Sequence, residues 1–431
     1  MKVALVNPPW DFTGSIYFGC RAPHLPLELG YAAALLHAAG HEALLLDGHL
    51  FGRSDADLCK EVATFGADMT VVTTAPSYLF WRCAPPELRV PAQFLRTLNG
   101  RGGRTLAVGP HGSVTPAATL RKLGVDGVVC GECEDVICAA AGADDWSTVA
   151  GIATLQAGQL RTKGASANHA FSELPPLRWP QNWIARHTHH HHRFDAPQTG
   201  FGAEVEASRG CPYACSFCAK LDYRDQYRKR NLAHILDEID AFVEQDVGYI
   251  YFIDEIFLPR MDLLTSLCKR NIVFGVQTRI DLWKPEQLEL LGRAGCVSIE
   301  AGIESLTVEG RAALAKRCKL DTDGLAALLI EARRHVPFVQ ANLIGADGDD
   351  HDLVAYWRGR LISAGVWANE PVPLYPYPSS PAYRQLWGMP DDDAWERAHA
   401  YYLASFSRFS DIQSEKPAPL TELEATCCLP A

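Results

Sequence analysis

Residues 210–218 read Gly-Cys-Pro-Tyr-Ala-Cys-Ser-Phe-Cys, and no other stretch says as much about architecture and chemistry. The three thiols, Cys211, Cys215 and Cys218, have the spacing C-x3-C-x2-C. A loop this short can wrap three thiolates around one small metal centre, and thiolates are the protein ligands of Fe–S clusters. A [4Fe–4S] cube normally takes four, so one iron is left open for a cosubstrate. The alternative, a structural zinc site, needs a fourth ligand, and no second C-x2-C pair follows at zinc-finger spacing.

The spacing resembles the signature of the radical S-adenosylmethionine (SAM) superfamily, in which an aromatic residue, here Phe217, precedes the third cysteine. The resemblance implies a catalytic [4Fe–4S] cluster on Cys211, Cys215 and Cys218, with SAM chelated to the open iron. An electron from the cluster then cleaves SAM to a 5′-deoxyadenosyl radical. This chemistry implies an electron-donor partner such as flavodoxin or ferredoxin.

The sequence around and after this motif alternates between apolar runs and helical stretches. Six βα repeats over 201–375 predict a partial (βα)6 TIM-like barrel, since a full barrel needs about 250 residues. Residues 376–431, rich in proline and aromatic side chains, are predicted to form a small helical cap. The candidate strands are 203–208, 249–253, 273–277, 297–301, 339–344 and 366–374.

Barrel active sites lie at the carboxyl ends of the strands, where this sequence carries polar residues. The resemblance implies that Asp254 or Glu255 binds the amino group of SAM there, and that Arg279 binds the SAM carboxylate or meets the substrate instead. It also implies that Glu304 and Ser305 contact the ribose of SAM and that residues 343–345 line its adenine. The usual Gly-Gly-Glu string is absent, which leaves the choice between Asp254 and Glu255 open.

Residues 1–150 also alternate, with apolar runs at 2–7, 43–47, 69–74, 106–109 and 127–130. Such alternation predicts an open parallel sheet covered on both faces, a Rossmann-like α/β domain. Ligands of such sheets lie beyond the carboxyl ends of the strands. Residues 151–200 contain several prolines and no sustained period, and we expect an irregular linker there.

This first domain resembles the cobalamin-binding domain that precedes many radical SAM modules. The matching pieces are 7–9 (Asn-Pro-Pro), 24–27 (His-Leu-Pro-Leu), 108–111 (Val-Gly-Pro-His) and 131–134 (Gly-Glu-Cys-Glu). The implied cobalamin contacts are Asn7, Thr73, Thr74, Ser77, Gly109, Pro110, His111, Gly131 and Glu132. The alternative is a Rossmann-like domain with another ligand or none. A dinucleotide is disfavoured because no G-x-G-x-x-G follows the first strand.

Other patterns carry weaker signals. Residues 47–52 match the cobalt-ligating motif D-x-H-x-x-G, but they follow the second strand, so we interpret His49 as coincidental and expect no protein ligand below cobalt. Cys130 and Cys133 form a C-x2-C that we interpret as core or loop thiols rather than a metal site. The histidines at 189–192 favour a mobile linker over an active-site lid, and basic segment 224–230 favours a solvated helix face over an anion site.

Composition bounds the remaining choices. The net charge of −11 over 431 residues argues against nucleic acid, which needs a basic face. No apolar run approaches the roughly 18–20 residues that cross a bilayer, so we expect a cytoplasmic protein without a membrane partner. Together the resemblances imply a cobalamin-dependent radical SAM enzyme that methylates an unactivated carbon of a small molecule. The alternatives are a rearrangement, oxidation or cyclisation with cobalamin absent or only an electron carrier, and a corrinoid or redox sensor.

Overall fold

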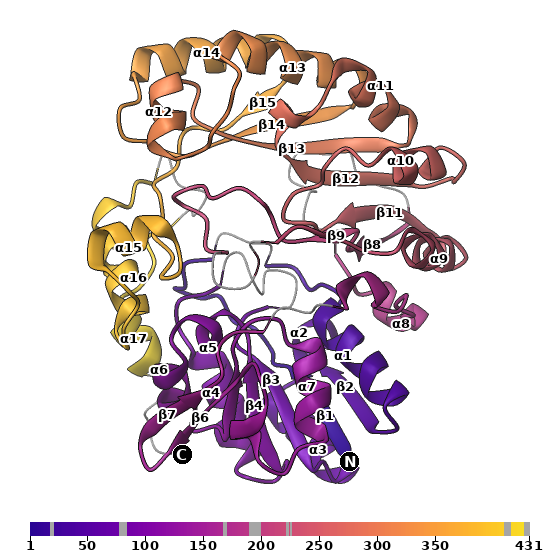
Figure 1. Ribbon diagram of the computed structural model, residues 1–431, viewed down its shortest axis with the longest axis vertical. Coiled ribbons are helices and arrows are strands. Elements are labelled where there is room, and N and C mark those ends of the chain that lie inside the picture. The colour runs from indigo at the N-terminus through magenta and orange to yellow at the C-terminus, as the bar shows by residue number, and fades with distance from the viewer. Residues whose placement is uncertain are drawn as a thin grey trace.

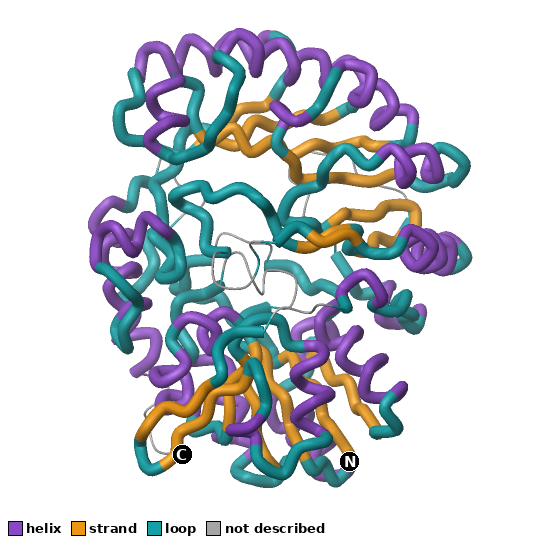
Figure 2. The backbone as a smooth tube through the Cα atoms, viewed as in Figure 1, coloured by secondary structure: helices purple, strands orange, loops and turns teal. Residues whose placement is uncertain are grey.

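The computed structural model describes residues 1–17, 21–76, 84–166, 170–188, 200–220, 224, 226–408 and 415–425. Two sheets lie at opposite ends of the molecule, and the C-terminal helices run along one side between them (Figure 1). The segments that lie between the sheets are mostly loops (Figure 2). Among the described residues, no helix is both long and apolar enough to cross a membrane.

The first sheet has the strand order β2-β1-β3-β4-β5-β6-β7, in which β1 to β5 are parallel. Alternate residues of β1 face opposite sides: Val3 and Leu5 pack with α1 and α7, and Ala4 and Val6 pack with α3, α4 and α6. Period-2 alternation with both faces apolar explains why these strands read as short apolar runs. The elements are β1 (Lys2–Asn7), β2 (Glu42–Asp47), β3 (Met69–Thr73), β4 (Arg104–Val108), β5 (Gly127–Val129), α1 (Leu27–Ala38), α2 (Gly48–Phe51), α3 (Asp55–Phe65), α4 (Arg89–Leu98), α5 (Pro110–Val114), α6 (Pro116–Leu123) and α7 (Glu134–Ala141).

The predicted irregular linker over 151–200 is wrong at its start. There β6 (Ile152–Gln156) and β7 (Gln159–Thr162) form an antiparallel hairpin that extends the first sheet beyond β5. The two-residue turn has positive φ at Ala157 (49°) and Gly158 (77°), as tight hairpin turns require. Ala-Gly is a poor sequence signal for such a turn, and β7 is exposed along its whole length, so no apolar alternation marks it.

The second sheet has six parallel strands in the order β15-β14-β13-β12-β11-β8, which confirms the predicted partial barrel. The last strand is far shorter than the predicted 366–374, because Pro371 and Pro373 lack the N–H that a strand ladder needs. The strands are β8 (Phe201–Val205), β11 (Val247–Phe252), β12 (Val273–Thr278), β13 (Cys296–Glu304), β14 (Phe338–Leu343) and β15 (Trp367–Ala368).

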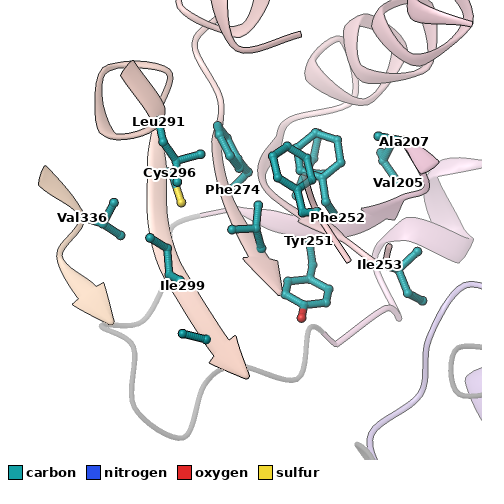
Figure 3. Packing of buried hydrophobic residues seen from close by; sticks show 14 of the residues in the cluster. Val205, Ala207, Tyr251, Phe252, Ile253, Phe274, Leu291, Cys296, Ile299 and Val336 are labelled. Carbon is teal, nitrogen blue, oxygen red and sulfur yellow. The ribbon is translucent and has the colours of Figure 1, made fainter. Parts of the chain in front are cut away.

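Helices cover the outer face of this barrel, and Figure 3 shows part of the apolar packing beneath them. Phe252 lies edge-on to Phe274 with ring centroids 5.4 Å apart, a favourable aromatic geometry. The flanking elements are β9 (Ser208–Arg209), β10 (Arg228–Lys229), α8 (Gln181–Ile184), α9 (Leu232–Val243), α10 (Met261–Leu267), α11 (Pro285–Arg293), α12 (Val308–Ala313), α13 (Thr322–His335) and α14 (His351–Ser363).

The C-terminal helices form the predicted cap and contact both sheets' domains. They are α15 (Pro381–Trp387), α16 (Ala394–Ser405) and α17 (Leu420–Ala425). The Ala382 N–H donates to the Ser216 carbonyl in the cysteine loop at 2.7 Å. At the other end, Trp395 stacks on His111 of the first domain, with ring centroids 4.4 Å apart. The cap therefore bridges the cysteine loop and the end of the first sheet.

Candidate active site

The cysteine loop follows β9 and is stabilised by backbone contacts from several elements. Its first residue, Gly210, has φ 82°, and a Cβ there would lie 2.1 Å from the Gln226 carbonyl oxygen. The Gly210 N–H donates to Glu255 Oε2 at 2.7 Å. Further along, the Ser216 N–H donates to the Leu314 carbonyl at 3.0 Å. The loop is thus held at its start by the end of β11 and at its centre by α12 and the cap.

The three predicted cluster ligands are free thiols in this one loop. Cys215 is buried, and Cys211 and Cys218 are half-buried. Burial raises the pKa of each, and the other two thiols contribute to raising that of Cys218 to about 12. Without a metal the site therefore favours neutral thiols, whereas a bound cation stabilises thiolates. Three soft donors in one partly buried loop fit a thiolate-ligated iron cluster.

The acidic residues predicted to contact SAM are held by protein groups. Asp254 Oδ1 accepts from the Ala207 N–H at 2.8 Å, and Oδ2 accepts from the Ser208 hydroxyl. Glu255 accepts from the Arg224 guanidinium at 2.6 Å as well as from Gly210. Both acidic side chains therefore position the segment that leads into the cysteine loop. A SAM contact from either of them stays a prediction.

The Asp254 carboxyl makes a pH-dependent contribution to stability. Burial raises its pKa to about 8, well above its ordinary value of 3.8. A raised carboxyl pKa means that the folded state holds a proton that the unfolded state releases, so stability falls as pH rises from about 4 towards 8. We expect the melting temperature to fall between pH 6.0 and 8.5, and to fall less in Asp254→Asn. Equal decreases in both proteins, followed by differential scanning calorimetry, would contradict this assignment.

Arg279, at the end of β12, meets a group of polar side chains beside the cysteine loop. Its Nη2 donates to Asp281 Oδ2 at 2.8 Å, and its guanidinium lies 4.1 Å from the centroid of the Tyr213 ring. The Lys316 ammonium contacts Glu304 and donates to the Gly302 carbonyl at 2.7 Å. Burial raises the pKa of Cys215, and Lys316 and Arg279 oppose that rise. These cations therefore lie close enough to favour negative charge at the cysteine loop.

Two predicted residues, Glu304 and Ser305, end β13 in an unusual conformation. Glu304 has φ 64°, a left-handed value that is costly for a residue with a Cβ. The Ser305 hydroxyl donates to Asp349 Oδ1 at 2.5 Å, and the Thr307 hydroxyl donates to the same oxygen at 2.6 Å. Asp349 thus fixes the turn after β13. The predicted ribose contacts of Glu304 and Ser305 stay predictions.

A cavity of about 340 Å³ opens beside the cysteine loop, between the barrel end and the cap. The predicted adenine segment reaches it through Gly345, whose N–H donates to the Val372 carbonyl at 2.7 Å. Its other lining residues come from the cysteine loop, the end of α12, the segment after β14 and the cap, and they include Ser216, Leu314, Asp347, Gln385 and Tyr401. The site therefore has a mixed polar and apolar space next to the cluster ligands.

At the first sheet, Asn7 and Thr73 lie together at the carboxyl ends of β1 and β3. Asn7 Nδ2 donates to Asp47 Oδ2 at 2.9 Å, and Asn7 Oδ1 accepts from the Trp10 indole at 2.7 Å and the Thr73 hydroxyl at 3.0 Å. Burial raises the pKa of Asp47 to about 7. The strand order β2-β1-β3-β4-β5 places the ligand crevice of such sheets between β1 and β3, where this network lies.

The neighbouring loops after β3 and β4 approach each other closely. Gly109 has φ 140°, and a Cβ there would lie 2.2 Å from Thr74 Oγ1. That hydroxyl is buried and has no hydrogen-bond partner among the residues that the structure describes. Burial lowers the pKa of His111 to about 3, so its imidazole is neutral, and Pro110 begins α5 beside it. We call Gly109 and Thr74 the cradle; their close backbone approach and the unsatisfied Thr74 hydroxyl fit the polar rim of a ligand such as a corrin. Ser77, another predicted cobalamin contact, lies outside the described residues.

The loop after β5 meets the second domain instead of standing alone. The Gly131 N–H donates to the Ser113 hydroxyl at 2.9 Å. Glu132 accepts from Arg228 Nη1 at 2.9 Å, and Arg209 lies 3.6 Å away. Burial opposes ionisation, but these guanidinium groups lower the pKa of Glu132 to about 2. The Glu132 carboxylate is therefore an ion-pair partner across the two domains, and its predicted cobalamin contact stays a prediction.

Three of the weaker patterns have a defined place in the fold. Cys130 and Cys133 are buried in separate hydrophobic clusters on opposite faces of the first sheet, which does not suit a shared metal ion. His49 contacts the Arg21 carbonyl at 3.0 Å. Residues 228–229 are a strand, and Arg224 and Arg230 are buried in ion pairs, so the predicted solvated helix face is wrong. Histidines 189–192 lie outside the described residues.

A buried group that the sequence did not predict joins the two domains near β8. His24 Nδ1 lies 3.2 Å from Glu204 Oε1, and the His187 ring centroid is 5.5 Å from that of His24. The atoms of His24, His187 and Glu204 that could bind a metal ion all lie within 4.8 Å of one another. However, the Leu25 N–H donates to His187 Nδ1 at 3.2 Å. The proton of the neutral ring therefore sits on Nε2, which makes that atom a hydrogen-bond donor and not a metal ligand.

Comparison with known proteins identifies the family. Residues 205–352 match the model of the radical SAM superfamily. This segment, about a third of the chain, therefore belongs to that superfamily. The match confirms the predicted radical SAM enzyme with a [4Fe–4S] cluster and SAM as cofactors, and it covers the cysteine loop and the barrel strands β11 to β14.

Two curated relatives of this radical SAM protein are methyltransferases. An uncharacterised methyltransferase of Pyrococcus horikoshii is 23% identical over 318 residues, covering 71% of this chain and 66% of the relative. The bacteriochlorophyllide d C-12(1)-methyltransferase of Chlorobaculum tepidum is 26% identical over 208 residues, covering 46% and 45%. The chain thus spans less than two thirds of either relative.

Solved structures share the fold over most of this chain. The radical SAM methyltransferase TsrM from Kitasatospora setae, with cobalamin and a [4Fe–4S] cluster bound, has a TM-score of 0.70 at 16% identity over 88% of this chain and 73% of its own. The cobalamin-dependent radical SAM enzyme OxsB has a TM-score of 0.68 at 16% identity over 95% and 67%. At this identity the likeness concerns the fold, and it confirms the predicted Rossmann-like domain followed by a barrel.

Proposed function

We propose that this radical SAM enzyme binds cobalamin in its first domain and methylates an unactivated carbon of a small molecule. The observation that carries the proposal is the joining of the two domains: Glu132 and Glu134, in the loop after β5, form buried ion pairs with Arg228 and Arg209 beside the cysteine loop. The methyltransferase names of the relatives, and the cobalamin in TsrM, support the same interpretation. Flavodoxin or ferredoxin is the electron donor we propose.

The residues divide the work between the two domains. Cys211, Cys215 and Cys218 hold the cluster, and Lys316 and Arg279 place positive charge near it. Thr74 and Gly109 form the cradle that receives the corrin rim. When bound, the cluster and SAM supply the radical and the corrinoid supplies the methyl group. The protein orients these groups and excludes water from the space between its two domains.

A second function has one observation in its favour. The anaerobic magnesium-protoporphyrin IX monomethyl ester cyclase of Rubrivivax gelatinosus is 29% identical over 144 residues, covering 31% of this chain and 24% of the relative. A ring-forming or oxidative outcome would use the same cluster without transferring a methyl group. Methyl-labelled SAM separates the two functions, because only a methyltransferase leaves the label in the product.

Cobalamin binding is the part of the proposal to test first. Anaerobically purified protein, titrated with hydroxocobalamin, should show a shifted corrinoid absorption spectrum. Gly109→Ala should weaken binding by about tenfold or more, because its backbone region is costly for any residue with a Cβ and the new methyl would meet Thr74 Oγ1.

The matched control for this variant is Gly124→Ala. Gly124 also has positive φ, at 65°, and lies in the same domain at the end of α6, but no atom lies within 4 Å of the position that the new methyl would take. Its affinity for hydroxocobalamin should equal that of the unchanged protein. No spectral shift with any of the three proteins would refute a corrinoid function, whereas equal binding by all three would refute only the cradle at Gly109.

A further inference from the structure

Seven charged side chains form a buried network between the first domain and the cysteine loop. We call this group the Arg–Glu network; its members are Arg209, Arg224, Arg228, Glu132, Glu134, Glu206 and Glu255. The side chains of Arg209 and Glu132 are 0% exposed, and that of Arg224 is 1% exposed. Charges this deeply buried are costly unless each is paired, so their arrangement is tightly constrained.

Arg209 is the centre of the network. Its Nε and Nη2 donate to the two carboxylate oxygens of Glu206 at 2.8 and 2.7 Å. Its Nη2 also lies 2.7 Å from Glu134 Oε1, which belongs to the first turn of α7. The forked guanidinium therefore joins the segment after β8 to the first domain. A fork of this kind fixes direction as well as distance.

Glu132 makes the second contact between the domains. Its carboxylate accepts from Arg228 at 2.9 Å and lies 3.7 Å from Arg224 Nε. Arg228 is in β10, which pairs with β9 directly before the cysteine loop. The first domain therefore contacts both strands of this pair, through Arg209 in β9 and Arg228 in β10.

The network ends on the backbone of the cysteine loop. Arg224 Nη1 lies 2.6 Å from Glu255 Oε1, and Glu255 Oε2 accepts from the Gly210 N–H at 2.7 Å. The Arg224 carbonyl accepts from the Cys211 N–H at 3.1 Å. A path of ion pairs and hydrogen bonds thus runs from Glu132 of the first domain through Arg224 to the first cluster ligand.

We propose that the Arg–Glu network is a positioning device, in which Glu132, Arg224 and Glu255 set the placement of the cysteine loop against the first domain and tune the reduction potential of the cluster. Charge and hydrogen bonding around a cluster determine its potential. Burial makes such an arrangement a poor source of stability compared with apolar packing, which argues for a role in geometry. The part that concerns the first domain rests on the proposed corrinoid function; the part that concerns the potential does not.

The test is an EPR-monitored redox titration of the reconstituted holoenzyme without cobalamin. Glu255→Gln and Glu132→Gln remove one negative charge each while keeping an amide oxygen as acceptor. Both should shift the cluster midpoint to a more positive value, because loss of a nearby negative charge stabilises the reduced cluster. Glu255→Gln should give the larger shift, since Glu255 contacts the loop itself.

The chain offers a matched control in Glu238→Gln. The Glu238 side chain is as fully buried as that of Glu132 and pairs with Arg230 at 2.6 Å, but its carboxylate accepts from the Leu177 N–H rather than from the cysteine loop. Its midpoint should stay at the value of the unchanged protein. The proposal would be overturned if the midpoints of all three variants equalled that of the unchanged protein, or if all three variants shifted by the same amount.

A milder variant covers the case in which the charge-neutralised chains do not fold. Arg228→Lys keeps the charge but loses the forked contact with Glu132, and the Arg228 side chain is 15% exposed, so a lysine is tolerated. In the cobalamin-loaded holoenzyme, it should lower methyl transfer while 5′-deoxyadenosine formation stays constant. Unchanged coupling between the two products would overturn the positioning role. Absence of methyl transfer in the unchanged protein would refute the proposed function and leave the potential measurements standing.

Discussion

Cys215→Ala is expected to lose the cluster and to form no 5′-deoxyadenosine. Cys215 is the most deeply buried of the three ligands and the middle one of the loop, so its loss leaves two thiolates for a cube that needs three from the protein. After anaerobic reconstitution with iron and sulfide, iron per chain should fall sharply. With dithionite and SAM, chromatography should detect no 5′-deoxyadenosine above the level without protein.

The control for this experiment is Cys296→Ala. Cys296 is 2% exposed and lies in the apolar core of the barrel among residues such as Phe274 and Ile299 (Figure 3). Removing its sulfur leaves a small void, which costs stability of about 1 kcal/mol but no ligand. Iron content and deoxyadenosine formation should therefore match the unchanged protein. Equal iron and equal deoxyadenosine in Cys215→Ala would refute the cluster assignment.

Much of the fold was predictable because parallel strands buried on both faces appear as short apolar runs. The predicted strand 2–7 matches β1, and 69–74 matches β3 within one residue. The hairpin β6–β7 escaped prediction because its outer strand is exposed and its turn lacks Asn-Gly or Asp-Gly. Local apolar pattern therefore predicts buried central strands well and sheet edges poorly.

The same distinction between local and long-range patterns applies to the candidate site. The cysteines were predictable because their spacing is local, within one loop. The Arg–Glu network was not, because its partners lie far apart in the sequence: Glu132 and Arg228 are 96 residues apart. Segment 224–230 had only its positive charge to indicate a role, and positive charge is equally typical of a solvated surface. Lys316, whose carbonyl accepts from Arg279, gave no sequence signal for the same reason, because the two residues are 37 positions apart.

Gly210→Ala should nearly abolish cluster assembly without touching a ligand. Two penalties combine at this position. The φ of 82° lies in the left-handed region, which costs an alanine about 1–2 kcal/mol. The new Cβ would also lie 2.1 Å from the Gln226 carbonyl oxygen, a backbone atom that cannot rotate away. The loop must therefore shift and lose the Gly210 N–H contact to Glu255. We expect the affinity for the cluster to fall about 10- to 100-fold, which is the effect typical of losing a supporting contact of a metal site.

Gly40→Ala separates these two penalties. Gly40 has nearly the same φ, 81°, but no atom lies within 4 Å of the position where a Cβ would be added. It therefore carries the conformational cost alone, and its holoenzyme should melt a few degrees lower with a full complement of iron. Gly210→Ala should instead assemble little iron even at temperatures where its circular dichroism spectrum is that of the folded protein. Equal iron content in the two variants would show that the close approach of Gly210 to Gln226 is not required for the cluster site.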